Sequence, residues 1–384
     1  MRIIIAGGGT GGHLMPGIAL AQKITQEDLE SRVLFLASDR EADIRTLSRY
    51  GIEAMHLAAR PAGRNPAAWP ALIIGGLKLI RQCHRIIGDF APDAAVGLGG
   101  YASFFPMVAA CLQRVPLVLL EQNVIPGKAT RRLAPFAAEV ACQWQETVRH
   151  FGVKVRTQAA GNPIREEILA GGHEEAIEQL HLAPGVKTLL VAGGSQGAHA
   201  INRMMIACAA DLAARAPGLQ IVHLTGHRDR ETVADAYEQA GLRAEAVAFL
   251  DDMSLAYRAA DFALSRAGGT TIAELAACGI PSILVPYPHA ANAHQAHNAR
   301  CLAEAGAAVV LQQDDFTPER LVGIICKFLT DEKLRTRMRT ACFALGRPNA
   351  ADTIYEMLGN YAQTQTSNNA AQAMSPQPAA KENT

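Results

Sequence analysis

The sequence predicts an α/β protein with two Rossmann-like domains, each built on a doubly wound parallel sheet. Short apolar runs bounded by glycine or proline alternate with longer segments of helical period. Such runs are typical of parallel strands that are buried on both faces. Their alternation with helices indicates a doubly wound sheet. The chain of 384 residues is too long for one ordinary domain and suits two.

Nine apolar runs are long enough to predict strands. The first half of the chain contains those at residues 2–6, 33–37, 94–98 and 117–120. The second half contains those at 188–192, 221–224, 246–249, 262–265 and 282–285. Segments such as 17–27 and 272–278 have the 3.6-residue period of helices that would cover the sheets.

A strand that leads into a glycine-rich loop occurs twice. Residues 2–6 precede GGGTGG at 7–12, and residues 188–192 precede GGSQGA at 193–198. Each pair predicts the start of a Rossmann-like domain. We expect a first domain over residues 1–162, a second over 163–348 and a last helix over about 349–361. Residues 363–384 are rich in Gln, Asn, Ala, Ser and Pro without apolar period, which predicts a disordered tail.

The charges are spread unevenly although the net charge is zero. Residues 1–162 carry 18 Lys and Arg against 12 Asp and Glu, and residues 163–384 carry 18 against 24. The basic half suits an anionic surface, with ordinary scatter as the alternative. The eight cysteines form no CxxC pair, so no zinc site is expected and a reducing compartment fits. No apolar run reaches the length of a membrane-spanning helix.

The first glycine loop ends in a histidine. It matches the dinucleotide fingerprint in form, with Asp39 after the next strand as a ribose-binding acid, so a nicotinamide enzyme is one interpretation. Its five glycines would equally let a bulky ligand approach the backbone, with His13 at the start of a helix. A capping or packing role is the alternative for His13.

Two more motifs follow strands of the first half. GLGGYAS at 97–103 and EQN at 121–123 come at the carboxyl ends of strands, where open α/β sheets bind ligands. The polar run from Glu121 to Asn123 suits sugar hydroxyls or an amide. A solvated loop is the alternative.

The second half contains two segments that suit phosphate. Ser195 adds a hydroxyl to the backbone N–H groups of the loop at 193–198. The segment SRAGGTTIAE at 265–274 predicts a strand, a glycine turn and a helix start, where the helix dipole favours a diphosphate. Glu274, about one turn inside, could accept hydrogen bonds from a ribose or merely offset the dipole. No Asp-x-Asp pair is present, so no metal site is predicted.

In this order, the motifs resemble the family of UDP-N-acetylglucosamine transferases of peptidoglycan synthesis, in glycosyltransferase family 28. The resemblance spans about residues 1–358 and implies a GT-B fold, in which two Rossmann-like domains face across a cleft and the last helix returns to the first. Leu120 and Phe104-Phe105 depart from the family pattern on the acceptor side. The motifs are GGGTGGHLMPGIALA (7–21), GGYAS (99–103), EQN (121–123), GNPIR (161–165), GGSQGA (193–198), FLDDM (249–253), GGTTIAEL (268–275) and HQAHNA (294–299).

The resemblance also implies roles for residues at matching positions. His13 is the first choice for the general base and Glu121 the second. Neither a metal nor a cofactor is implied. The expected substrate contacts are Arg165 and the backbone at Leu250 near uracil; Glu274 on the ribose; Ser195 and Gly269, Thr270, Thr271 and Ile272 near the diphosphate, followed by Ala273; Gln295 and Asn123 on the N-acetylglucosamine; and Thr10, Gly11 and Gly12 on the acceptor side.

The implied reaction is inverting transfer of N-acetylglucosamine from UDP to the 4-hydroxyl of the muramyl sugar of undecaprenyl-pyrophosphoryl-MurNAc-pentapeptide. The implied partners are an anionic membrane surface and other cell-wall synthesis proteins, but no nucleic acid. The expected location is peripheral, on the cytoplasmic face of the cell membrane. The alternatives are another UDP-sugar-dependent GT-B enzyme, a nicotinamide oxidoreductase and a non-catalytic scaffold that binds a nucleotide sugar.

Residues 60–87 are the candidate for membrane contact. Apolar residues beside cations suit insertion at an anionic surface. The alternative is an amphipathic helix that packs on the sheet and has an ordinary basic outer face. The apolar candidates are Trp69, Leu72, Ile73, Ile74, Leu77, Leu79 and Ile80, and the cations are Arg60, Arg64, Lys78, Arg81 and Arg85.

Overall fold

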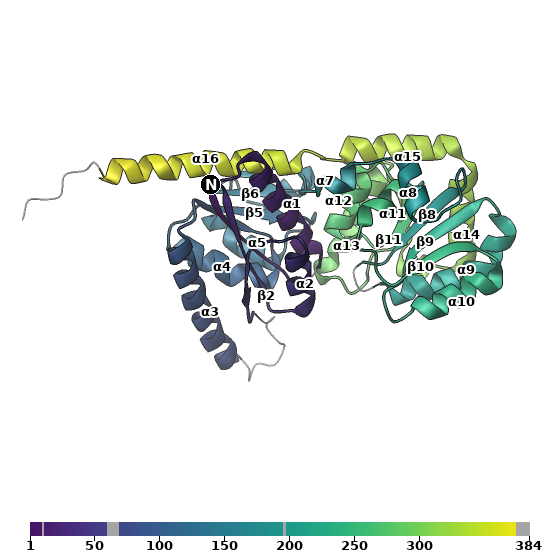
Figure 1. Cartoon of the computed structure of the whole chain (residues 1–384), viewed down its shortest axis with the longest axis horizontal. Coiled ribbons are helices and arrows are strands. Elements are labelled where there is room, and N and C mark those ends of the chain that lie inside the picture. The colour runs from purple at the N-terminus through teal and green to yellow at the C-terminus, as the bar shows by residue number, and fades with distance from the viewer. Residues whose placement is uncertain (10, 60–68, 195–196, 374–384) are drawn as a thin grey trace, which may run out of the picture.

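The computed structural model describes residues 1–9, 11–59, 69–194 and 197–373. It contains two lobes that lie side by side, each built around one sheet (Figure 1). The strand order is β3-β2-β1-β4-β5-β6-β7 in the first sheet and β10-β9-β8-β11-β12-β13 in the second. All strand pairs are parallel. Both sheets thus share the Rossmann order, with a switch point between the first and fourth strands.

The first lobe alternates strands and helices from the start of the chain. Its elements are β1 (Arg2–Gly7), α1 (Gly11–Glu27), β2 (Arg32–Ser38), α2 (Glu41–Arg49), β3 (Ala54–Leu57), α3 (Trp69–Phe90), β4 (Ala94–Gly97), α4 (Gly100–Leu112), β5 (Leu117–Glu121), α5 (Lys128–Leu133), η2 (Ala134–Phe136), β6 (Glu139–Cys142), α6 (Gln145–Val148) and β7 (Thr157–Gln158).

The second lobe follows two short helices, α7 (Glu166–Leu169) and α8 (His173–Gln179). Its elements are β8 (Lys187–Ala192), α9 (His199–Arg215), β9 (Leu219–Leu224), α10 (Arg230–Ala240), β10 (Arg243–Val247), α11 (Met253–Ala259), β11 (Phe262–Ser265), α12 (Gly269–Ala277), β12 (Ser282–Leu284), η3 (Ala291–Ala293), α13 (His294–Glu304), β13 (Ala308–Val310), η4 (Gln313–Asp315), α14 (Pro318–Thr330) and α15 (Glu332–Leu345).

Strand β1 explains why the apolar runs form a central sheet. Successive side chains of a strand point to opposite faces. Ile3 and Ile5 therefore pack into the apolar core with α1, whereas Ile4 packs into the core with α3 and α4. All three are fully buried. A strand covered by helices on both faces needs an uninterrupted apolar sequence, as this one has.

The last helix, α16 (Ala350–Ala373), leaves the second lobe and packs on the first (Figure 1). Ile354 and Leu358 are fully buried in the core that contains Ile3. Helix α16 continues through residues 363–373, within the segment for which the sequence predicted a disordered tail. Extending an existing helix fixes few further dihedrals, and the Ala and Gln residues there have good helix propensity. Residues 374–384 lie outside the described residues.

Four strands went unpredicted and one was misplaced. β3, β6, β7 and β13 have two to four residues each and lie at or next to an edge of their sheet, where less of the strand must be buried. β10 spans Arg243–Val247 rather than 246–249. It is an edge strand with charged residues, so its apolar signal is weak. None of the helices in the described part of the chain is long and apolar enough to cross a membrane.

Candidate active site

The predicted site residues that the structure describes lie mainly where the carboxyl ends of the two sheets face each other. Helix α1 starts after β1 in the first lobe, and α12 starts after β11 in the second. The Thr270 hydroxyl donates a hydrogen bond of 2.6 Å to the Gly12 carbonyl, so the two helix starts are in contact. Each start presents backbone N–H groups and the positive end of a helix dipole. The interface therefore suits an anionic group held between the lobes.

The first glycine loop is held by a carboxylate that the sequence did not reveal. Asp43, on α2 and 3% exposed, accepts hydrogen bonds from the Gly9 N–H at 2.6 Å and from the Ser38 hydroxyl. A Cβ on Gly8 would lie 2.6 Å from an Asp43 oxygen. Gly8 and Gly9 also have φ of 130° and 84°, which only glycine adopts readily. This role was not visible in the sequence, because Asp43 reaches the loop only once α2 packs beneath it.

His13 lies on the first turn of α1, beside the second glycine motif. A Cβ on Gly100 would lie 3.3 Å from His13 Nδ1, so the glycine leaves room for the imidazole. Nδ1 is buried and has no hydrogen-bond partner among the described residues. Burial lowers the pKa of His13 to about 4; nearby His294 lowers it further, and Asp43 opposes the change. The neutral form of the imidazole is therefore favoured, because burial disfavours its charged form.

Glu121, at the end of β5, is occupied by donors from its own loop. One oxygen accepts from the Asn123 N–H at 3.1 Å and from Asn123 Nδ2 at 3.2 Å. The other accepts from the Gly127 N–H at 2.8 Å. Burial raises the pKa of Glu121, and these donors oppose the increase. The carboxylate thus holds the loop that contains Asn123, which leaves it little capacity to accept a proton from a substrate.

The residue that joins this loop to the second lobe is Asn298, which the sequence analysis did not single out. Its Oδ1 accepts from the Val124 N–H at 3.0 Å, and its Nδ2 donates to Asn123 Oδ1 at 3.1 Å. The same Nδ2 donates to the Ala267 carbonyl at 3.1 Å. Its position in the HQAHNA motif was the available signal. Its hydrogen bonds to the first lobe form only when the two lobes meet, so a local sequence pattern could not predict them.

The start of α12 packs closely on the first lobe. A Cβ on Gly269 would lie 2.7 Å from the Gln122 carbonyl oxygen, so only glycine fits. Ile272 and Ala273 are buried and Thr271 is partly buried. Gln295 Oε1 accepts from the Ala267 N–H at 3.3 Å and from the Tyr287 N–H at 2.9 Å.

Glu274 and Arg165 form a buried pair behind this helix start. Glu274 is 6% exposed; one oxygen accepts from the Tyr257 hydroxyl at 2.7 Å and the other lies 3.8 Å from Arg165 Nη2. Burial raises the pKa of Glu274, and the Arg165 guanidinium opposes the increase. Arg165 also donates to the Tyr50 hydroxyl of the first lobe. The structure thus brings together the residues expected at ribose and uracil. Leu250 packs at the edge of the adjoining apolar core.

The loop after β8 is described only on either side of its centre. A Cβ on Gly197 would lie 2.1 Å from the Thr225 carbonyl oxygen, and its φ is 72°. Gly193 and Gly194 directly precede residues 195–196, which lie outside the described residues. Thr10 and Ser195 lie outside the described residues, and Gly11 begins α1. Within the described ranges, no group of three or more His, Cys, Asp or Glu side chains could hold a metal ion.

Comparison with known proteins identifies the family. Residues 3–142 match the glycosyltransferase family 28 N-terminal domain, and residues 188–354 match the C-terminal domain of that family. A protein of Halothermothrix orenii is 38% identical over 94% of this chain and 100% of its own length. One of Thermodesulfovibrio yellowstonii is 38% identical over 93% and 98%. Both are named UDP-N-acetylglucosamine–N-acetylmuramyl-(pentapeptide) pyrophosphoryl-undecaprenol N-acetylglucosamine transferase.

Solved structures agree with this result. The crystal structure of Acinetobacter baumannii MurG superposes with a TM-score of 0.72 at 27% identity, covering 94% of this chain and 99% of that one. The calicheamicin glycosyltransferase CalG4 gives 0.63 at 17% identity, covering 93% and 98%, which supports the fold alone. The fold is GT-B, as the sequence predicted. The chain therefore belongs to glycosyltransferase family 28, and within it to the UDP-N-acetylglucosamine transferases that act on muramyl-pentapeptide pyrophosphoryl-undecaprenol.

Proposed function

We propose that this chain transfers N-acetylglucosamine from UDP to the 4-hydroxyl of the muramyl sugar of undecaprenyl-pyrophosphoryl-MurNAc-pentapeptide, with inversion at the anomeric carbon. The observation that carries the proposal is the contact between two helix starts, His13 on one side and the Gly268–Thr271 segment on the other, joined by the Thr270–Gly12 hydrogen bond. A single displacement needs a base and a stabilised leaving group on opposite sides of one carbon. Here each lobe provides one of them.

The donor would lie mainly on the second lobe. The N-terminus of α12 would hold the diphosphate, assisted by the hydroxyls of Thr271 and Ser195. Glu274 would bind the ribose and Arg165 the uracil end, near Leu250. Each Glu274 oxygen has one partner and can accept a second hydrogen bond, so ribose hydroxyls could bind beside the Tyr257 and Arg165 contacts. Gln295 and Asn123 would hold the sugar from opposite sides.

The reaction requires one proton transfer. The acceptor hydroxyl forms the new bond to the anomeric carbon as the bond to the diphosphate oxygen breaks. His13, neutral at pH 7 because burial lowers its pKa, takes the hydroxyl proton. The departing UDP carries the electron pair of the broken bond, and the α12 dipole stabilises its added charge. Glu121 acts by holding the Asn123 loop rather than as a base.

The acceptor is carried by a lipid, and α3 is the proposed contact with an anionic membrane. Ile74 and Leu77 are each 56% exposed, beside the exposed cations Lys78 and Arg81. Leu79, by contrast, is buried in the core of the first lobe. Leu79 therefore lies on the inner face of the helix, as the packing alternative predicts, and is not part of the proposed membrane surface. Residues 60–68 lie outside the described residues, and nothing is assigned to the side chains of Trp69, Leu72 and Ile73.

Two of the departures from the family pattern, Phe104 and Phe105, lie near this helix, whereas Leu120 packs on the other face of the sheet, in the core that contains α1. Phe105 packs on α3, since a Cβ on Gly76 would lie 2.9 Å from its ring. Phe104 and Phe105 make an edge-on contact with ring centroids 5.5 Å apart. Leu120 is buried in the core of the first lobe. Apolar side chains at these positions therefore contribute to packing beside the acceptor side.

Incubation with UDP-N-acetylglucosamine and a short-chain analogue of the lipid acceptor tests the function. The expected products are the lipid-linked disaccharide and UDP in equal amounts, detected by mass spectrometry. UDP release with no disaccharide would contradict the assigned acceptor. Binding without turnover would indicate a scaffold, and oxidation of the donor with a nicotinamide cofactor would indicate the rival enzyme class.

A further inference from the structure

A buried side-chain amide connects the two sides of the proposed site. Asn298 lies on α13 and is fully buried, with 0% exposure. It makes three hydrogen bonds of 3.0–3.1 Å, to Val124 and Asn123 in the first lobe and to Ala267 in the second. A side chain with no exposed surface cannot touch a substrate. Any effect of Asn298 on the reaction must therefore pass through the residues that it holds.

In the first lobe, the Asn298 amide fixes the orientation of the Asn123 side chain. Asn123 Nδ2 donates to Glu121 Oε1 at 3.2 Å, and Asn123 Oδ1 accepts from Asn298 Nδ2 at 3.1 Å. Glu121 can only accept when ionised, so the row Glu121–Asn123–Asn298 has one consistent assignment of donors and acceptors. Rotating the Asn123 amide by 180° would place like atoms against each other at both ends. The loop after β5 is thus held from both sides.

On the second lobe, the same helix holds the residue that precedes the glycine turn of α12. Gln295 Oε1 accepts from the Ala267 N–H, and Asn298 Nδ2 donates to the Ala267 carbonyl. The two amides are three positions apart on α13, which places them on one face of the helix. Both polar groups of Ala267 are therefore bound by α13. Ala267 leads directly into Gly268 and Gly269, where the diphosphate is expected.

We propose that Asn298 is a positioning residue for glycosyl transfer. It aligns the Asn123 loop, which would hold the sugar, with the start of α12, which would hold the diphosphate. The inference rests on the proposed function, because alignment matters only if one donor spans both loops. Misplacing a bound group by about 1 Å can lower a rate by about 100-fold. Losing the amide should therefore impair sugar transfer more than nucleotide binding.

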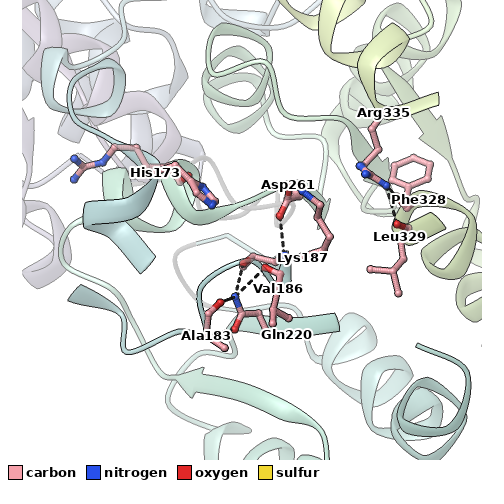
Figure 2. A network of polar contacts seen from close by, with 11 residues as sticks. His173, Ala183, Val186, Lys187, Gln220, Asp261, Phe328, Leu329 and Arg335 are labelled. Carbon is pink, nitrogen blue, oxygen red and sulfur yellow. Dashed lines mark hydrogen bonds and ion pairs between the residues drawn. The ribbon is translucent and has the colours of Figure 1, made fainter. Parts of the chain in front are cut away.

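The test compares two buried amides of the second lobe. Gln220 on β9 is 2% exposed and makes four hydrogen bonds, to Ala183, Val186 and Thr188. Figure 2 shows its contacts with Ala183 and Val186. Thr188 is at the start of β8, whereas α12 begins beyond the end of the neighbouring parallel strand β11. Asn298→Leu and Gln220→Leu each replace a buried amide with an apolar side chain. We expect both to lower the Tm. Only Asn298→Leu should lower kcat/KM for UDP-N-acetylglucosamine, by roughly 10- to 100-fold, with the Kd of UDP changed less than about threefold.

A double-mutant cycle locates the effect. In an Asn123→Ala background the Asn123 contact is already absent and only the Val124 and Ala267 contacts of Asn298 remain, so adding Asn298→Leu should lower kcat/KM by a smaller factor than it does in the wild type. Additive losses, or equal losses for Asn298→Leu and Gln220→Leu, would overturn the inference and leave Asn298 with a purely structural role. If Asn298→Leu does not fold, Asn298→Ser replaces it, with the same criteria. An inactive wild type would instead overturn the proposed function itself.

Discussion

The charge on His13 depends on the residues around it. Burial and His294 lower its pKa to about 4, while Asp43 opposes the change. The imidazole is therefore neutral at pH 7 in the free protein, as a proton acceptor must be. With so low a pKa it is also a weak base. An anionic diphosphate bound nearby would favour the protonated form and raise the pKa toward the working pH.

Titration of His13 by NMR tests this electrostatic argument. In the free protein the His13 signal should titrate near pH 4, and the midpoint should move upward when UDP-N-acetylglucosamine is bound. Among the 12 histidines, the signal is assigned by its loss in His13→Gln. A midpoint near 6.5 in the free protein would mean that the ring is solvated, contrary to the structure.

Replacing the imidazole tests its role in catalysis. His13→Ala should lower kcat by about 10²- to 10⁴-fold, the usual range for loss of a general base. The Kd of UDP should be nearly unchanged, because the proposed nucleotide contacts lie on the second lobe. Glu121→Gln keeps the shape of the other candidate and serves as the comparison. If His13→Ala retains its turnover while Glu121→Gln abolishes it, the assignment of the base is reversed.

A substitution of Glu274 tests how the second lobe binds the nucleotide of the donor. Glu274→Ala should weaken UDP binding by about 1–3 kcal/mol, the scale of a charge-assisted hydrogen bond. Because the change also leaves Arg165 without its buried partner, the variant must first be shown to fold by circular dichroism. Calorimetry then measures the Kd of UDP. An unchanged Kd in a folded variant would exclude the ribose role.

Residues whose roles depend on tertiary contacts were the ones that sequence reasoning missed. His13, Glu274 and Glu121 could be found because they follow glycine loops or strands directly. Asp43 and Asn298 could not, since each holds a loop from another element. The low pKa of His13 could not be predicted from the sequence either, because it results from burial of the ring in the folded site.

Among the elements, the central strands were predicted well and the edges poorly. β1, β2, β8 and β11 are buried on both faces, so the full apolar signal is present in their sequences. β7 has two residues and lies at a sheet edge, where little burial is required. Helix α3 has an apolar face that packs on the sheet and an outer face with exposed apolar residues beside cations. Leu79, Cys83 and Ile87 face the core, while Ile74 and Leu77 remain exposed beside cations.

Vesicle co-sedimentation tests the outer face of α3. The variant Ile74→Ser, Leu77→Ser, Lys78→Glu, Arg81→Glu should lose binding to anionic vesicles, because it removes the exposed apolar surface and two cations worth about 1 kcal/mol each. Wild-type binding should decrease with salt. The control reverses Lys333 and Arg337, exposed cations on α15 of the second lobe. Equal sedimentation of all three proteins would place the membrane contact elsewhere.

At the scale of the whole molecule, the two lobes place a base and a diphosphate site on opposite sides of one interface. Their sheets have the same order over six strands, and the helix that starts after the first strand of one lobe contacts the helix that starts after the fourth strand of the other. Both the duplication and the fold were visible in the sequence, since two strand-and-glycine-loop starts were present. How the lobes meet was not, because contacts such as Thr270–Gly12 and Arg165–Tyr50 join residues more than 100 positions apart.

The anomeric configuration of the transferred sugar tests the central claim most directly. UDP-N-acetylglucosamine has the α configuration, and a single displacement between a base on one lobe and a leaving group on the other must invert it. NMR of the disaccharide product should therefore show a β linkage, with none of the α anomer. An α-linked product would mean that UDP departs from, and the acceptor hydroxyl attacks, the same face of the sugar, and would contradict the proposed arrangement of the two lobes around the reaction.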